Sequence, residues 1–571
     1  MNQKEYILKK IKDLFPDLDV KSLEDLFEIP REIKMGDLAF PCFVLAKNLK
    51  KNPLEIAKEV ASNISKDDVI LKVEAIGPYV NFFFQPKYIF QTVCKEILKQ
   101  KNKYGCSNFG KDQKILVEYS GPNTNKPLHL GHARNNILGM AVSNVLETAG
   151  YKVVKANLIN DRGVHINKSM LAYQKWGFGK TYQSENKKSD YFVGEYYVLY
   201  DQMKKECPEI EDEIKVMLKK WEDGDKNILS LWKKMRKWAI DGMNETYKRM
   251  GTKFDVVYYE SDTYLEGKEI VKQGLKDKIF KKEKTGEITI DLTEQGLDKK
   301  ILLRSDGTAL YITQDIATSK RKFDEHHPDK AIWVVCNEQD YHFNVLFEVL
   351  EKLKIVEKKN LFHLSYGEVK LTTGRMKSRE GIVVDVDNLM DELHEMAKAE
   401  IKKRDDKIED GELERRAEII SQSALKYYLI KSNPKKDITF NPQESISFDG
   451  NTGPYIQYAY ARIQSIINKK KITAKDGVFG LLGNLEERVL VNLLAEFPQV
   501  VRASALEYNP ADIANFVYEL AQGFNRFYHG HSVLSADSED LIQARLKLIL
   551  AVGIVLKNGL GLLGIDVVEK M

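Results

Sequence analysis

The sequence predicts three regions of different fold class: a mixed α+β domain at the amino terminus, a parallel-sheet α/β domain, and an all-α helical bundle at the carboxyl terminus. Two patterns lead to this prediction. Between residues 113 and 385, short β-branched runs alternate with helical segments, which is typical of parallel strands joined by crossover helices. From residue 386 onward, apolar residues recur at helical spacing, as in Leu389, Met390 and Leu393. A chain of 571 residues is long enough for several domains.

The overall composition limits the partners and compartments that we expect. The formal net charge is only +4, so any nucleic-acid surface must be a local patch and not a global basic field. The five cysteines form no CxxC pair, which argues against a zinc knuckle or a disulfide framework and favours a reducing, cytoplasmic location. The longest apolar run, near residues 548–556, is too short to cross a bilayer, so we expect no membrane association.

Residues 1–112 are predicted to form the amino-terminal domain. Helical patterns cover residues 6–15 and 53–64 and flank a glycine–aspartate turn at residues 36–37. Residues 79–84 follow as an apolar strand with phenylalanines on both faces. Core packing is the interpretation that we favour for these aromatic rings, and the alternative is that one of them stacks on an unpaired base.

The most informative stretch, residues 114–150, has the pattern of a strand, a loop and a helix. The loop delivers His129 and His132 to the start of the helix, where free backbone N–H groups and the helix dipole favour an anion. Imidazoles can donate to phosphate oxygens, and Gly131 leaves room for a nucleotide against the backbone. Two histidines alone could equally be surface residues. Together with the flanking strand and helix, they favour nucleotide binding.

The rest of the middle region carries a second set of strand and helix signals. A lysine-rich, mostly helical segment at about 180–290 interrupts the α/β pattern, so we predict an insertion there. Strand signals return at residues 301–304 and 331–336, and polar clusters follow strands at residues 160–165 and 337–342. Because ligands bind at the carboxyl ends of parallel strands, we expect these polar clusters to line the functional site.

A second basic loop lies about 240 residues after the histidine pair. Arg375, Lys377 and Arg379 alternate along it, and Gly374 and Gly381 bracket it. A cationic loop of this kind is suited to stabilising phosphate charge as it develops. By itself such a loop is usually a solvated turn, but its place in the same sheet domain as the histidines favours a role in phosphate chemistry.

The helical region contains aromatic residues interleaved with basic ones. Tyr455, Tyr458 and Tyr460 precede Arg462, and a second cluster occupies residues 524–529. Unstacked RNA bases need aromatic surfaces and phosphates need cations, so this composition suits a flexed RNA loop. The alternative is a helical bundle with half-buried tyrosines, and we expect it to hold for some of these residues.

Taken together, these motifs resemble one family over essentially the whole chain, the arginyl-tRNA synthetases of class I. The resemblance rests on EYSGPNTNKPLHLGHARNN, NDRGVHI, LLRSDGTALYITQDIA, NEQDYHF, GRMKSREG, NTGPYIQYAYARI and the terminal LLGIDVVEKM. It implies a Rossmann-type catalytic domain at residues 113–385 and an amino-terminal domain at residues 1–112 that touches the tRNA elbow. It also implies a helical stem-contact connection at residues 386–450 and an anticodon-binding domain at residues 451–571.

The chemistry of arginine agrees with this resemblance. A guanidinium is a planar fork of donors with a permanent charge, so selecting it over lysine requires acceptors in fixed positions, ideally carboxylates. Glu118 ends the first predicted strand and Asp315 follows another. The family resemblance implies that seven residues bind arginine: Glu118, Ser120, Asn123, His132, Tyr311, Asp315 and Gln339. Such a pocket can reject analogues without editing, so the insertion is not interpreted as an editing domain.

The resemblance also implies roles for the two basic motifs and for the carboxyl-terminal helices. The second lysine of the usual Lys-Met-Ser-Lys-Ser loop is replaced here by Ser378, and Lys126, Lys377 or Arg379 could take over its role. The implied catalytic residues are His129, His132, Lys126, Arg375, Lys377 and Arg379. The implied ATP-binding residues are His129, Gly131, His132, Met376, Lys377 and Ser378. The implied tRNA-binding residues are Tyr455, Tyr458, Arg462, Asn525, Tyr528 and Met571.

The expected activity is therefore ligation of L-arginine to the terminal adenosine of tRNA(Arg), through arginyl-adenylate formed from ATP. Mg²⁺ is expected with ATP, without a resident protein-bound metal, and the resemblance implies attack by the 2′-hydroxyl and activation only after tRNA is bound. The expected oligomeric state is a monomer. The alternatives are another nucleotidyl transferase with the same histidine motif and a non-catalytic RNA-binding protein derived from a synthetase.

Overall fold

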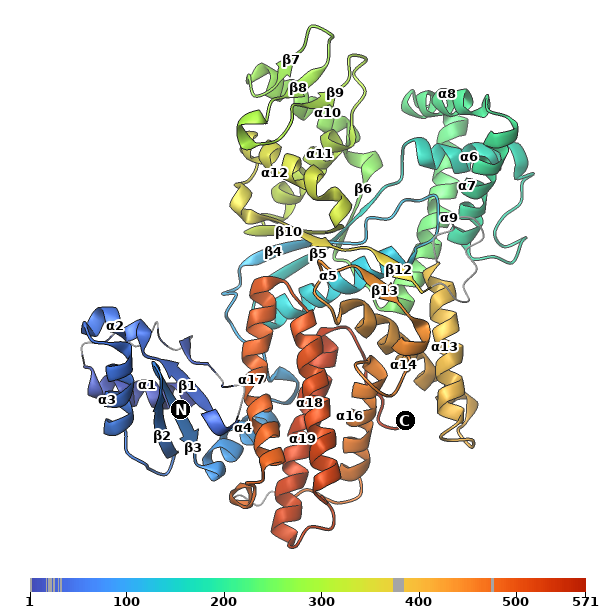
Figure 1. The fold of residues 1–571 in the computed structure, drawn as a ribbon. Helices are drawn as coiled ribbons and strands as arrows, with labels where there is room; N and C mark the ends of the chain where they lie inside the picture. The colour runs from blue at the N-terminus through green and yellow to red at the C-terminus, as the bar shows by residue number, and fades with distance from the viewer. Residues whose placement is uncertain are drawn as a thin grey trace.

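The computed structural model describes residues 3–571, with the exception of residues 17, 19–22, 24–25, 29, 31–32, 373–384 and 474–476. Figure 1 shows the amino-terminal domain at one side of the molecule, a sheet in the middle, and the carboxyl-terminal helices packed below that sheet. The three regions of different fold class that the sequence predicts are thus present.

The amino-terminal domain is a small antiparallel sheet covered by helices. Its strand order is β1-β3-β2, and the central strand β3 is the predicted apolar strand. Phe82 and Phe84 are fully buried and Phe83 is nearly so, which confirms the core interpretation for these rings and leaves none of them free to stack on a base. The elements are α1 (Gln3–Leu14), β1 (Leu38–Pro41), α2 (Phe43–Leu49), α3 (Pro53–Asn63), β2 (Ile70–Ile76) and β3 (Tyr79–Phe84). The next helix, α4 (Pro86–Gln100), packs against the carboxyl-terminal bundle.

The middle region is built on a five-stranded parallel sheet of order β11-β10-β4-β5-β6. Alternate side chains of its central strand enter different cores: Ile115 and Val117 join the core that contains helix α5, whereas Leu116 joins the core that contains helices α10, α11 and α12. The strands are β4 (Lys114–Glu118), β5 (Lys152–Ile159), β6 (Val256–Tyr259), β10 (Lys330–Cys336) and β11 (Leu361–Tyr366). The covering helices are α5 (Leu130–Thr148), α10 (Glu260–Lys276), α11 (Tyr311–His326) and α12 (Asp340–Lys352).

The predicted insertion is shorter than the 180–290 segment. The inserted helices end at Met250, after which β6 joins the parallel sheet beside β5 and α10 covers that sheet. The four residues of β6 form an edge strand with one partner, so they carry too little apolar signal to stand out in the sequence. The helices of this region are α6 (Val164–Trp176), α7 (Ser189–Glu206), α8 (Ile210–Glu222) and α9 (Lys226–Met250).

Two further strand predictions in the middle region are wrong in detail. The apolar run near Ile301 forms β9 (Lys300–Leu303), which pairs antiparallel with β8 (Ile288–Ile290) in a separate sheet with β7 (Lys281–Lys282). The segment that contains Asp315 is not the end of a strand, because helix α11 begins at Tyr311. A short apolar run shows that a strand forms but does not reveal which strand it pairs with.

The carboxyl-terminal region is helical as predicted, with one short exception. The exception is β13 (Ile438–Phe440), which pairs in parallel with β12 (Val369–Leu371) just before the residues outside the described chain. The helices are α13 (Val386–Lys402), α14 (Asp410–Ile430), α15 (Pro442–Ser445), α16 (Gly453–Ile467), α17 (Leu485–Glu507), α18 (Ala511–Gly530) and α19 (Glu539–Leu562). Within the described residues, α17 alone has the length and hydropathy of a membrane span, and here it packs against α18 in the bundle.

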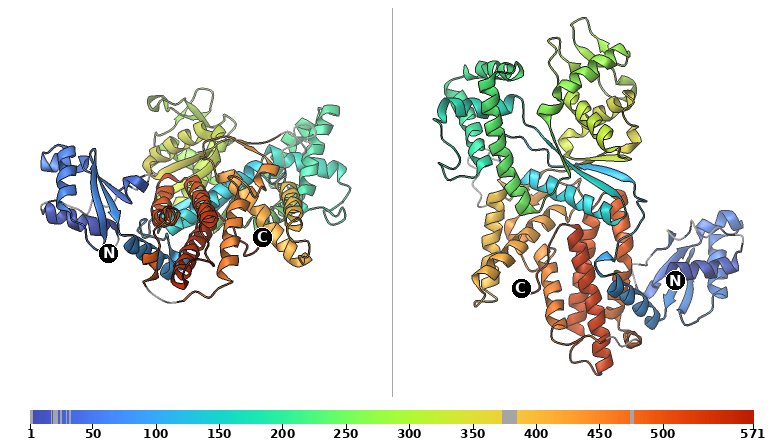
Figure 2. Two further views of the ribbon diagram at one scale, coloured as in Figure 1. Left: turned by 60° about the horizontal axis from the view of Figure 1, so that its bottom comes forward. Right: turned by 180° about the vertical axis from the view of Figure 1, so that it is seen from behind.

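A buried carboxylate joins the amino-terminal domain to the helical bundle. Asp37 accepts from the backbone N–H of Phe84 at 2.8 Å, and Arg488 of α17 donates to both of its carboxylate oxygens at 2.9 and 3.0 Å. Asp37 has no solvent-exposed side-chain surface. The two views of Figure 2 show the amino-terminal domain beside the α17 side of the bundle, in agreement with this contact.

Candidate active site

The predicted histidine pair lies at the start of helix α5, which follows the carboxyl end of β4. His129 is the N-cap residue, and its Nδ1 accepts from the backbone N–H of Gly131 at 3.1 Å. His132 completes a capping box, because its Nδ1 accepts from the backbone N–H of His129 at 3.2 Å. The two ring centroids lie 3.8 Å apart. The loop and helix thus hold both imidazoles in fixed orientations.

This capping arrangement fixes the hydrogen-bonding role of each ring. Because Nδ1 of both His129 and His132 accepts a backbone proton, the hydrogen of each neutral ring is on Nε2, which is then a donor. Burial, with a contribution from Lys126, lowers the pKa of His129 to about 4. Burial, with His129 and Lys126, holds the pKa of His132 well below its usual range. Two neutral N–H donors therefore lie at the positive end of the helix dipole, an arrangement that suits phosphate oxygens.

The loop before the histidines is held in place by the insertion. A Cβ on Gly194 of α7 would lie 2.8 Å from Pro127 and 3.5 Å from the Cα of Lys126, so the helix packs directly on the loop. Burial lowers the pKa of Lys126 from its ordinary value. The same loop is also joined to the start of α13, where Val386 donates its N–H to Leu128 at 3.1 Å.

The second basic loop, with Arg375, Met376, Lys377, Ser378 and Arg379, lies outside the described residues. The described chain resumes at Asp385, whose backbone forms an isolated bridge with that of His129. The carboxylate of Asp385 caps α13 through the N–H groups of Asp387 and Asn388. The chain that leaves the basic loop is therefore attached to the histidine motif.

Glu118 ends strand β4, as the sequence predicts, on the face of the sheet that α11 covers. Its carboxylate forms an ion pair with Lys322 of α11. The Lys322 ammonium also lies 5.6 Å from the ring centroid of Trp333 and 5.8 Å from that of Tyr258. This lysine could not be predicted from sequence patterns, because some two hundred residues separate it from Glu118.

Asp315 lies on the second turn of α11 and pairs with His342 from the start of α12. The distance from Nε2 of His342 to Oδ2 of Asp315 is 2.6 Å, and the two side chains are 26% and 29% exposed. Tyr311, the first residue of α11, is 71% exposed, and Gln339, just before α12, is exposed as well. These polar side chains thus share one accessible edge of the sheet domain.

Ser120 and Asn123 lie in the loop after β4. Ser120 has a φ of +83°, which is unusual for a residue other than glycine, and neighbouring polar groups fix it. Its backbone N–H donates to Asn135 at 2.5 Å, and its hydroxyl lies 2.6 Å from that of Tyr247. Asn123 forms a backbone bridge with Asn160 after β5. The sequence prediction missed Asn135 and Tyr247, which hold this loop.

A charged cluster that joins the insertion to α13 was also missed. Lys188 donates to Asp387 at 2.6 Å, to Thr246 of α9 at 2.5 Å and to Asp190 at 3.1 Å. Burial raises the pKa of Asp190 to about 6, against the opposing effect of Lys188. The only sequence signal was two lysines next to an acidic residue, which is typical of a solvated surface. The cluster braces the helices that pack on the histidine loop.

The predicted RNA-binding residues of the helical bundle come together around Arg462. The Arg462 guanidinium donates to Asn525 at 3.1 Å and to the hydroxyl of Tyr458 at 3.0 Å. It lies 4.6 Å from the ring centroid of Tyr458 and 5.1 Å from that of Tyr528. Asn525 donates in turn to the hydroxyl of Tyr455 at 2.9 Å. Four side chains thus gather around one cation on α16 and α18.

Met571, the sixth residue of that prediction, lies at the margin of this arrangement. Met571 and Phe448 each pack against an apolar cluster formed mainly by α13 and α14. The ring of Phe448 lies 6.3 Å from that of Tyr458, so this apolar cluster adjoins the Arg462 cluster.

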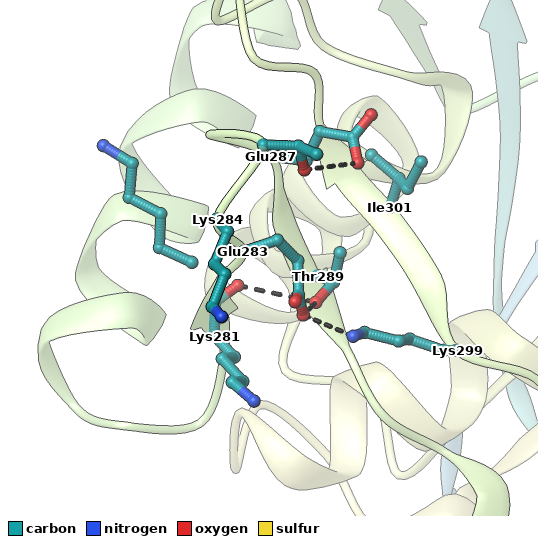
Figure 3. Close-up of a pocket in the computed structure, with 9 residues that line it drawn as sticks. Lys281, Glu283, Lys284, Glu287, Thr289, Lys299 and Ile301 are labelled. Atoms are coloured by element: carbon teal, nitrogen blue, oxygen red, sulfur yellow. Dashed lines mark hydrogen bonds and ion pairs between the residues drawn. The ribbon is translucent and has the colours of Figure 1, made fainter.

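A surface hollow of about 490 Å³ lies elsewhere, over the small sheet of β7, β8 and β9. Figure 3 shows that Lys281 and Lys284 extend from it, whereas Lys299 pairs with Glu283, which also accepts from Thr289. Figure 1 places this sheet at the far end of the domain from α5. The hollow holds none of the predicted site residues.

Comparison with known proteins identifies the class to which this fold and site belong. Residues 93–442 match the family model described as the catalytic domain of class I (R) tRNA synthetases. Residues 456–571 match the DALR anticodon-binding domain, and residues 1–84 match the amino-terminal domain of arginyl-tRNA synthetases. The molecule is therefore a class I aminoacyl-tRNA synthetase in its fold and its histidine motif.

Individual relatives show which family of class I synthetases the chain belongs to. The chain is 47% identical to the arginine–tRNA ligase of Treponema denticola over 556 residues, covering 95% of this chain and 94% of the relative. It is 42% identical to the arginine–tRNA ligase of Phocaeicola vulgatus, covering 99% and 98%. The arginyl-tRNA synthetase structure of Thermus thermophilus superposes with a TM-score of 0.83 at 26% identity, covering 100% and 99%. The chain belongs to the arginyl-tRNA synthetase family.

Proposed function

We propose that this protein activates L-arginine with ATP and transfers it to the 3′-terminal adenosine of tRNA(Arg). Two observations carry the proposal: the fixed pair of neutral imidazoles at the start of α5, and the full-length similarity to arginine–tRNA ligases. The other nucleotidyl transferases that use a similar histidine motif have no need of an anticodon-binding domain, which this chain matches over residues 456–571.

In the first step, the arginine carboxylate attacks the α-phosphate of ATP, and pyrophosphate leaves. The carboxylate is already ionised and needs no general base, so the protein contributes positioning and charge stabilisation. The Nε2–H groups of His129 and His132 donate to the phosphates, and Gly131 allows the nucleotide to approach the backbone. Lys126 and the basic loop with Arg375, Lys377 and Arg379 stabilise the departing pyrophosphate, and Met376 and Ser378 contact the nucleotide.

The arginine pocket lies at the accessible edge of the sheet domain. Asp315 with Tyr311 receives the guanidinium, and Glu118, Ser120, Asn123 and Gln339 form the remainder of the pocket. Two features of α11 support this assignment. Tyr311 is exposed and the Asp315 carboxylate is partly exposed, so a ligand can reach both side chains. An analogue without the guanidinium leaves the Asp315 carboxylate without its partner, which disfavours its binding.

Mg²⁺ reaches the site with ATP in this proposal. Among the described residues, no three histidine, cysteine, aspartate or glutamate side chains lie together as a metal site. The phosphate oxygens of ATP bind Mg²⁺ in this proposal, as is usual for Mg²⁺ in phosphate chemistry.

The other regions bind tRNA in this proposal. Residues 451–571 receive the anticodon loop, with Arg462, Tyr455, Tyr458, Asn525, Tyr528 and Met571 at the contact. Residues 386–450 approach the inner stem, and residues 1–112 touch the elbow. The Arg462 cluster supports the assignment, since it combines a cation with half-exposed aromatic rings. The protein acts as a cytoplasmic monomer.

A charging assay tests this proposal. The protein is incubated with ATP, Mg²⁺, total tRNA and radiolabelled arginine, and acid-precipitable label is counted. We expect labelled tRNA with arginine and none with lysine under the same conditions. Charging with a different amino acid, or binding of tRNA without any charging, would refute it.

A further inference from the structure

We propose that Lys322 sets the charge of the arginine pocket. By pairing with Glu118, it neutralises one of the two carboxylates assigned to the pocket and leaves Asp315, which is hydrogen-bonded to His342, to match the single net positive charge of arginine and to disfavour doubly charged analogues. The inference rests on the proposed assignment of Glu118 and Asp315 to the arginine pocket.

The position of Lys322 is the first observation. Tyr311, Asp315 and Lys322 are at positions i, i+4 and i+11 of α11, which an α-helix places on one face. The exposed Tyr311 and the partly exposed Asp315 lie toward the start of this face. Lys322 lies toward its end and reaches Glu118 at the carboxyl end of β4. One helix therefore presents both a carboxylate and an ammonium to the same pocket.

The burial of the pair is the second observation. The side chain of Lys322 is 1% exposed and that of Glu118 is 11% exposed. Removing two charges from water is costly, and an apolar pair of similar size often serves stability equally well. The aromatic rings of Trp333 and Tyr258 further surround the ammonium, so solvent cannot screen its charge. Either charge, if left here without its partner, would therefore act strongly on a charged ligand nearby.

The charge balance follows from these contacts. Glu118 and Lys322 cancel, so the pocket retains the charge of Asp315, and arginine carries one net positive charge as a zwitterion with a guanidinium. Argininamide lacks the carboxylate and carries two positive charges while its α-amino group is protonated. The wild-type pocket should therefore favour arginine, and a pocket without the lysine charge should discriminate less against argininamide.

The test compares inhibition by argininamide with the KM for arginine in ATP–pyrophosphate exchange at pH 6.5, where an α-amino group is mostly protonated. Lys322→Met should shift this ratio toward argininamide on the order of tenfold, the effect expected for one charge several ångströms away in a medium of intermediate dielectric. Glu118→Gln, which leaves the lysine charge uncompensated, should shift it in the opposite direction. The double variant Glu118→Gln/Lys322→Met should return it to the wild-type value, as should Lys322→Arg.

Other charged groups near the pocket do not affect this comparison. Glu260 lies near Asp315, and burial raises its pKa to about 7. Arg162 pairs with Glu222, and His342 pairs with Asp315. These groups are the same in every variant, so their effects cancel from the ratio.

The outcomes separate the inference from the proposed function. An unchanged ratio in Lys322→Met would overturn the inference, and so would a Glu118→Gln ratio that shifts toward argininamide. If Lys322→Met does not fold, Glu118→Gln and the double variant test the same inference. The ratio should shift away from argininamide in Glu118→Gln and return to the wild-type value in the double variant. Absence of arginine-dependent exchange in the wild-type protein would instead refute the proposed function on which the inference rests.

Discussion

The histidine motif and the Arg462 cluster hold their polar groups in different ways. At the start of α5, backbone N–H groups of the helix fix the rings of His129 and His132. On α16 and α18, the Arg462 guanidinium is held by side chains, those of Asn525 and Tyr458. Groups fixed by the backbone are preorganised before a ligand arrives, whereas a side-chain network can rearrange around its ligand.

The two regions are therefore suited to different roles, one in the chemical step and the other in RNA binding. Preorganised donors are what a chemical step requires, since charge develops there within a fixed geometry. An adaptable cluster is better suited to a flexible RNA loop, which must unstack its bases on binding. Substitutions at the two regions should therefore affect different measured quantities, and the following predictions test this separation in order of decreasing effect.

The largest effect is expected for His129→Asn. Asparagine is a good N-cap residue, so it should preserve the start of α5 and the thermal stability of the protein. Its shorter side chain cannot place a donor where Nε2 lies, so arginine-dependent pyrophosphate exchange should fall about 10²- to 10³-fold. Thermal melting monitored by circular dichroism checks the first expectation. A large fall in melting temperature with an equal fall in rate would show that the ring serves only as a cap.

A smaller, more selective effect is expected for Asp315→Ala. Removing a carboxylate that pairs with a guanidinium should raise the KM for arginine on the order of a hundredfold and leave the KM for ATP within a few-fold. Steady-state kinetics with each substrate varied in turn measure both constants. The matched control is His342→Gln, which retains a donor toward Asp315 and should change neither constant by more than a few-fold. Equal increases for arginine and ATP would contradict the assignment.

The third prediction concerns pH and stability. The pKa of His129 is about 4 in the folded protein, below the ordinary value near 6.5, so the unfolded chain binds more protons between these limits. The stability from this group is therefore present at neutral pH and is lost as the pH falls through that window. Between pH 7 and pH 5 the loss should be on the order of 2 kcal/mol. Urea unfolding at the two pH values measures it, and His129→Asn should reduce the difference by that amount.

The smallest effect is expected at the Arg462 cluster. Arg462→Ala should raise the KM for tRNA about tenfold and leave tRNA-saturated charging within two-fold, because it removes a cation from an adaptable surface. Lys272→Ala is the control, since Lys272 pairs with the exposed Glu269 on α10, in the sheet domain and outside the regions proposed to bind tRNA. A fall in kcat without a change in the KM for tRNA would contradict the assignment of tRNA binding, and not catalysis, to the Arg462 cluster.

The sequence predicted the parts of the site that local patterns encode. The strand before Glu118, the helix after His129, and the two histidines at its start all follow from short-range periodicity and capping. The aromatic and basic cluster was also visible, because helical spacing brings Tyr455, Tyr458 and Arg462 onto neighbouring turns.

Contacts between distant segments could not be predicted in the same way. Lys322 meets Glu118, and Lys188 meets Asp387, only because the sheet brings separate elements together. The short edge strand β6 was assigned to the insertion, and Asp315 was assigned to a strand end although it lies in α11. In each case the local sequence fits two structures, and tertiary pairing selects between them.

The central claim is that the fixed donors at α5 serve an activation step specific for arginine. The most direct test is ATP–pyrophosphate exchange with each of the twenty amino acids in turn, with and without total tRNA. We expect exchange with arginine when tRNA is present and background exchange with every other amino acid. Exchange that proceeds equally well without arginine, or with another amino acid in its place, would contradict it.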